Sequence, residues 1–224
     1  AAIPNSLVIM PDHWRGRPIL DIPTLSPTAG RFRAAMGLFM QIPRVFYRMR
    51  LVHNWPALKQ LLEPLIAELR LRHPDAQFLC YGYCFGAYLV CKCSSYLGFS
   101  AGVSYHPSPQ VCRFQPSAHR QTEQDLAVAA RCPILLLPAG NDPEKLKEDG
   151  EFVRWLPSGS GSHTYPDMKH GYMSRAAFDE TPMANLMGGN SEDIAAAQAD
   201  ALQRTIAFFN EALKLPAVPA GSEP

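Results

Sequence analysis

A turn with the sequence Gly82-Tyr83-Cys84-Phe85-Gly86 lies near the middle of the chain, between two segments of different character. The preceding residues 77–81 form a short apolar run that is typical of a buried strand, and residues 87–96 are typical of a helix. A strand that passes through a tight turn into a helix is the unit from which parallel sheets are built. The turn therefore predicts an α/β fold in which Cys84 sits on a sharp bend.

The rest of the chain repeats this alternation of strands and helices. Residues 55–72 form an amphipathic helix pattern, residues 101–105 and 133–137 read as buried strands, and residues 191–214 read as a final helix. The apolar run Leu7-Val8-Ile9-Met10 also reads as a buried strand. This alternation indicates a three-layer fold with a mainly parallel sheet. We predict one domain over residues 1–214 and a flexible tail at 215–224, where three prolines occur.

Composition excludes several classes of partner and predicts a reducing compartment. The formal net charge is +1, which favours no nucleic-acid partner, and no apolar run is long enough to span a membrane. The chain starts without the pattern of a secretion signal, so we expect a cytoplasmic protein. Its six cysteines lie mostly in apolar stretches and are predicted to be free thiols. Their spacing predicts no metal site, and no cofactor is expected.

Three reactive side chains follow predicted strands, at the edge where parallel strands end. Cys84 follows the strand ending at Tyr81, Asp142 follows the strand ending at Leu137, and His170 follows the last predicted strand near Tyr165. A cysteine at a helix start favours the thiolate, a histidine can move its proton, and a carboxylate can orient the histidine ring. We therefore predict a catalytic triad of Cys84, His170 and Asp142. Glu144 is an alternative to Asp142.

Other residues are predicted to surround this triad. The N–H of Phe85 is placed to bind an oxyanion, and Tyr83 is predicted either to line the acyl pocket or to pack the turn. His106 and His13 each follow a predicted strand. His106 is expected to be a loop residue or to line the pocket rather than to catalyse, and His13 either lines the same pocket mouth or, as we favour, has no role in the site. Five arginines within residues 31–50 could bind a substrate carboxylate or could form a solvated, lid-like segment.

These motifs resemble those of dienelactone hydrolases (carboxymethylenebutenolidases), a family of α/β-hydrolases. The turn Gly82-Tyr83-Cys84-Phe85-Gly86 is similar to the family's nucleophile elbow, and residues 11–16 resemble its Pro-Asp stretch. Ala139-Gly140-Asn141-Asp142 is similar to the acid turn, and Lys169-His170-Gly171-Tyr172 to the histidine loop. The resemblance extends from about Leu7 to Asn210. It implies an α/β-hydrolase-type fold and a cysteine that attacks lactones and related esters without a cofactor.

The start of the chain departs from the family pattern. Family members have further strands before the segment that Leu7 to Pro11 resembles, and a loop after the central one supplies an oxyanion-hole N–H and a glutamate that helps activate the cysteine. We expect either that this chain lacks those N-terminal strands, which we favour, or that Leu7 to Pro11 is itself the central strand. In the first case the oxyanion hole is expected to be incomplete.

Two functions remain open from the sequence. The first is a cysteine-dependent hydrolase of small lactones or esters that works through an acyl-enzyme, as monomer or dimer. The second is a catalytically weak or inactive α/β-hydrolase-like protein that uses the same pocket for binding.

Overall fold

The computed structural model describes residue 3, residues 6–11, residue 43, residues 47–48, residues 54–174 and residues 191–214. Its helices and strands, in chain order, are α2 (Trp55–Arg72), β1 (Leu79–Tyr83), α3 (Gly86–Tyr96), β2 (Ala101–Tyr105), η3 (Pro109–Phe114), η4 (Ser117–His119), α4 (Glu123–Val128), β3 (Ile134–Leu137), η5 (Glu144–Leu146), α5 (Glu151–Trp155), β4 (Gly161–Ser162) and α7 (Ser191–Ala212).

The strands form one parallel sheet in the order β1-β2-β3-β4. Tyr83 pairs with Tyr105, and Gly102 pairs with Ile134. The short β4 is extended by a parallel bridge between Ala139 and Tyr165. Since every strand is parallel, the segments that follow them all leave at the same edge of the sheet. The candidate site residues therefore gather at that edge.

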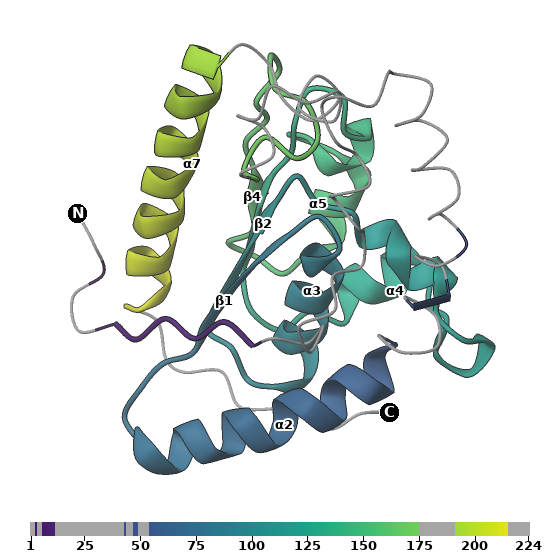
Figure 1. The fold of residues 1–224 in the computed structure, drawn as a ribbon, viewed down its shortest axis with the longest axis vertical. Coiled ribbons are helices and arrows are strands. Elements are labelled where there is room, and N and C mark those ends of the chain that lie inside the picture. The colour runs from purple at the N-terminus through teal and green to yellow at the C-terminus, as the bar shows by residue number, and fades with distance from the viewer. Residues whose placement is uncertain are drawn as a thin grey trace, which may run out of the picture.

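Helices cover both faces of this sheet, as Figure 1 shows. Helix α7 lies along one face, where Ala101, Val103 and Tyr105 of β2 join its apolar residues in one buried cluster. Helices α2, α3, α4 and α5 contribute to a second cluster on the other face, together with Ile134 and Leu136 of β3. Alternate residues of the strands thus serve two cores. This arrangement confirms the predicted three-layer α/β architecture with a parallel sheet.

Helix α2 has the bounds that the apolar spacing predicts. The side-chain oxygen of Asn54 accepts a hydrogen bond from the N–H of Ala57 (3.1 Å), which caps the first turn. The apolar face carries Trp55, Leu58 and Ile66 into the second core cluster. A strong amphipathic pattern between clear end signals therefore fixed both ends of this helix.

The segment Leu7-Val8-Ile9-Met10 is not a strand, which corrects the sequence-based expectation. Residues 6–11 have no regular secondary structure, and Met10 is 82% exposed. The interpretation of Leu7 to Pro11 as the central strand of the sheet is therefore wrong. A four-residue apolar run carries too little periodicity to distinguish a buried strand from an exposed coil.

Some predictions fall on residues outside the described part of the chain. These include the tail at 215–224, His13, and the arginine-rich segment 31–50 apart from residues 43 and 47–48. The single domain over residues 1–214 stays a prediction.

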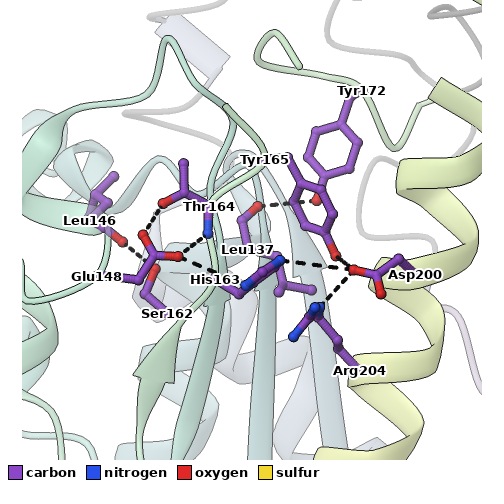
Figure 2. A network of polar contacts seen from close by, with 10 residues as sticks. All are labelled: Leu137, Leu146, Glu148, Ser162, His163, Thr164, Tyr165, Tyr172, Asp200 and Arg204. Carbon is purple, nitrogen blue, oxygen red and sulfur yellow. Dashed lines mark hydrogen bonds and ion pairs between the residues drawn. The ribbon is translucent and has the colours of Figure 1, made fainter. Parts of the chain in front are cut away.

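A polar network ties the segment after β4 to helix α7 (Figure 2). Asp200 of α7 accepts hydrogen bonds from the hydroxyl of Tyr165 (2.8 Å) and from Nε of Arg204 (2.6 Å). On the other side, the carboxylate of Glu148 accepts hydrogen bonds from the N–H and the hydroxyl of Thr164. The network holds residues 163–165 between two elements and so fixes the base of the loop that carries His170.

Candidate active site

Cys84 occupies the bend between β1 and α3 in a backbone conformation that side chains rarely adopt. Its φ is 49°, in the left-handed region. The N–H of Cys84 donates to the carbonyl of Tyr105 (3.1 Å), and the carbonyl of Cys84 accepts from the N–H of Ser108 (3.0 Å). These two hydrogen bonds connect the bend to the neighbouring strand β2 and to the residues that follow β2. This backbone strain is held by its surroundings, which is typical of a functional position.

The two glycines of the bend differ in what they permit. A Cβ at Gly82 would lie 2.5 Å from the carbonyl oxygen of Gly86, so the turn leaves no room for a side chain there. A Cβ at Gly86 would meet no heavy atom within 4 Å. The tight turn therefore excludes a side chain at position 82, whereas none of the described residues crowds position 86.

We predict opposite effects when these glycines are replaced. Gly82→Ala is expected to lower the free energy of unfolding by about 1–3 kcal/mol or more, because backbone must shift to admit the methyl group. Gly86→Ala is the matched control. It is expected to be neutral or to stabilise by up to about 1 kcal/mol, because alanine favours the helix that begins there. Urea denaturation of both variants measures this, and equal losses would contradict the assigned close approach.

Asp142 and His170 form the second part of the site. Nδ1 of His170 lies 2.6 Å from Oδ1 of Asp142, and the other oxygen of this buried carboxylate accepts from the N–H of Ala139 (2.8 Å). The N–H of His170 donates to the side-chain oxygen of Asn141 (2.6 Å). The turn after β3 therefore holds both the ring and the backbone of His170. A carboxylate bound to Nδ1 leaves Nε2 as the nitrogen available for proton transfer.

The protonation states of Cys84 and His170 are coupled. Burial alone would raise the pKa of the Cys84 thiol, but the imidazoles of His106 and His170 and the hydroxyl of Ser108 outweigh it and lower the pKa to about 5. Burial alone would lower the pKa of His170, but the Asp142 carboxylate and the Cys84 sulfur raise it to about 10. Both shifts favour a thiolate at Cys84 paired with an imidazolium at His170 at neutral pH.

The other five cysteines have the opposite character. None forms a disulfide, as the sequence predicts. Burial raises the pKa of Cys91 and Cys93 to about 12, and the pKa of Cys112 and Cys132 to about 11. Burial also raises the pKa of Cys80 well above its ordinary range. Cys84 is thus the thiol poised to react at neutral pH.

Ser108 is a site residue that the sequence analysis did not identify. Its hydroxyl lies 3.6 Å from Sγ of Cys84, in addition to the backbone bond between the same residues. The available signal was its position just after the carboxyl end of β2, two residues beyond the predicted pocket residue His106. A hydroxyl that donates to the thiolate favours the charged form.

Ser108→Ala is expected to raise the pKa of Cys84 by up to about one unit, which is the net worth of one hydrogen bond. The alkylation rate of Cys84 below pH 6 should then fall by up to about tenfold. The pH dependence of iodoacetamide labelling measures this shift. A midpoint that stays at the wild-type value would contradict a hydrogen bond to the sulfur.

Tyr83, Phe85 and His106 are the other predicted site residues that the structure describes, and they lie at the same edge of the sheet. Tyr83 is partly exposed, and its ring stacks on that of Tyr105 with centroids 4.9 Å apart. Phe85 is the residue between Cys84 and the start of α3. His106 is buried, and its ring centroid lies 4.8 Å from that of His170. Within the described ranges, no cluster of three or more metal-ligating side chains occurs, and no helix could cross a membrane.

A parallel sheet with helices on both faces, a cysteine on a strained strand-to-helix bend, and an acid and a histidine from later loops define an α/β-hydrolase architecture. The sequence model of the dienelactone hydrolase family matches residues 46–213, well over half of the chain. The chain therefore belongs to the dienelactone hydrolase family, as its motifs indicated, and this membership supports a hydrolase of the α/β type.

One curated relative extends this comparison. An uncharacterised AIM2 family protein of Schizosaccharomyces pombe is 28% identical to the chain over 176 residues. The match covers 76% of this chain and 61% of that protein, so the chain spans about three-fifths of the length of this relative. No solved structure matches the chain.

Proposed function

We propose that this protein is a cysteine-dependent hydrolase of small esters or lactones that acts through an acyl-enzyme on Cys84. The observation that carries the proposal is the coupled pair of Cys84 and His170. Hydrogen bonds and charge from the site lower the pKa of the cysteine to about 5, and the 2.6 Å contact with Asp142 orients the histidine. Such a pair supplies both a nucleophile and a proton donor at neutral pH.

The proposed reaction has two halves. The thiolate of Cys84 attacks the ester carbonyl carbon, and a C–S bond forms as the carbonyl electrons move to oxygen. The C–O bond then breaks, and the imidazolium of His170 gives its proton to the leaving alkoxide. Water attacks the resulting thioester, with neutral His170 taking its proton. The C–S bond breaks, the acid leaves, and the thiolate returns. The N–H of Phe85 is the expected oxyanion donor.

Substrate size and compartment are part of the same proposal. The acyl group is expected to be small, with Tyr83 beside it, and no metal or organic cofactor is required for the proposed steps. A cytoplasmic location is consistent with six free thiols.

Trapping the acyl-enzyme tests the proposal directly. The protein is mixed with 4-nitrophenyl acetate, quenched in acid at short times, digested and analysed by mass spectrometry. We expect an initial burst of nitrophenolate and an acetyl group on the peptide that contains Cys84. Protein whose Cys84 has first been alkylated with iodoacetamide is the control and should give neither. Hydrolysis with no acyl group on Cys84, or no hydrolysis at all, would reject the proposal.

A further inference from the structure

His106 follows β2 at the carboxyl edge of the sheet and has an unusual backbone. Its φ is 36°, in the left-handed region, while its N–H still donates to the carbonyl of Leu137 on β3 (2.9 Å). The strand pairing therefore continues to His106, and the chain turns sharply there. For residues other than glycine, asparagine and aspartate, this backbone conformation costs conformational free energy on the order of 1–3 kcal/mol.

The imidazole of His106 is buried without a hydrogen-bond partner. Its side chain is 3% exposed, and neither ring nitrogen has a hydrogen-bond partner among the described residues. A buried polar group left without a partner costs about 1–3 kcal/mol. One residue thus carries both backbone strain and an unsatisfied ring. Because both unfavourable features occur at one residue beside Cys84, they indicate that His106 has a role in the site.

The surroundings of His106 point to the sulfur of Cys84 as its partner. The ring contacts the ring of His170 at 70° and that of Tyr83, with centroids 4.8 Å and 6.0 Å away. The carboxylate of Asp142 is already bound to His170 and to a backbone N–H. The backbone of Cys84 is hydrogen-bonded to Tyr105 and to Ser108, which flank the turn at His106, so the cysteine lies beside that turn. The His106 imidazole helps to lower the pKa of the Cys84 thiol, although neither ring nitrogen hydrogen-bonds to the sulfur in this arrangement.

We propose that His106 is a positioning residue for the nucleophile: a second imidazole whose ring N–H holds the thiolate of Cys84 beside His170. This inference rests on the proposed function. His170 must leave the sulfur to protonate the leaving group, and it must later serve the attacking water. In both steps, His106 and Ser108 still donate hydrogen bonds to the sulfur. The thiolate is also the leaving group of deacylation, so a second donor speeds its departure.

The ionisable groups around His106 determine what a titration reports. They come from the bend, from β1, from the turn after β3 and from the loop after β4: Cys84, Tyr83, Asp142, His170 and Tyr172. Burial raises the pKa of Tyr83 to about 12 and that of Tyr172 further, so both stay neutral in the range of interest. The alkylation of Cys84 between pH 4 and 9 therefore reports the thiol itself and the groups that donate to it.

The test is the pH dependence of iodoacetamide alkylation at Cys84, followed by mass spectrometry. The wild-type midpoint is expected near pH 5. His106→Phe keeps a ring and removes both nitrogens, and should raise the midpoint by one unit or more, which slows alkylation at pH 5 by about fivefold or more. His106→Asn and His106→Gln place an N–H near the former Nδ1 and Nε2, and one of them should restore part of the shift. Tyr172→Phe is the packing control and should leave the midpoint unchanged.

A folded His106→Phe variant with the wild-type midpoint would overturn the inference. If that variant also raises KM for an ester, His106 contacts substrate and not the sulfur. If His106→Phe does not fold, the ring nitrogen NMR shifts of His106 in the wild type and in Cys84→Ala decide the question, because loss of the sulfur must change them. Alkylation needs no ester, so the result stands even if the protein hydrolyses none.

Discussion

Cys84→Ala is expected to lower the hydrolysis of an activated aryl ester by at least about 10³-fold, as the loss of a nucleophile does in other triad hydrolases. The sulfur forms the bond to the acyl group in the proposed reaction, so its removal takes away the proposed nucleophile. The fold should survive, because alanine meets the same backbone strain at φ 49° and loses only one heavy atom. Initial rates with 4-nitrophenyl acetate, together with thermal unfolding of the same samples, measure both expectations.

Cys80→Ala is the matched control for this experiment. It removes a thiol from β1, close to the bend in sequence, whose pKa burial raises well above its ordinary range. Its activity should stay near that of the wild type. If Cys84→Ala retains its activity, or if both variants lose activity equally, Cys84 is not the nucleophile.

The fold was predictable where the sequence has a strong pattern and clear ends. The bounds of α2 follow from its apolar face and from Asn54 and His73 at its ends, and β2 has the predicted bounds of Ala101–Tyr105. Two predictions that relied on short apolar runs were wrong, and the reason is physical. The run Leu7-Val8-Ile9-Met10 is apolar but short and exposed, and β1 begins two residues later than its apolar run suggested. Short runs do not specify burial or register on their own.

The sequence predicted which residues form the site better than it predicted how they are arranged. Cys84, Asp142 and His170 carry local motifs in a recognisable order, and parallel strands bring the residues after them to one edge. Ser108 and the orientation of His106 depend on a backbone turn at the end of β2. A positive φ at a histidine has no signature in the sequence, because glycine is the residue that usually marks it.

His170→Ala is expected to have the second large effect, on both activity and thiol reactivity. The variant loses the proton donor to the leaving group and the cation that favours the thiolate, so ester hydrolysis should fall by about 10²-fold or more. The pKa of Cys84 should rise from about 5 toward its ordinary range. Because a thiol reacts only above its pKa, the alkylation curve should move to higher pH, and labelling at pH 6 should slow by about tenfold if the pKa rises by two units.

His163→Ala is the control that separates this effect from the loss of any histidine in the same segment. His163 lies 3.9 Å from the carboxylates of Glu148 and Asp200, in the network that links the β4 segment to α7. Its replacement should leave the alkylation midpoint of Cys84 unchanged, although it could lower thermal stability slightly. A His170→Ala variant that still labels at pH 5–6 like the wild type would show that His170 does not stabilise the thiolate. In that case His106 and Ser108 would have to account for the depressed pKa alone, and the assignment of His170 as the proton donor would lose its main support.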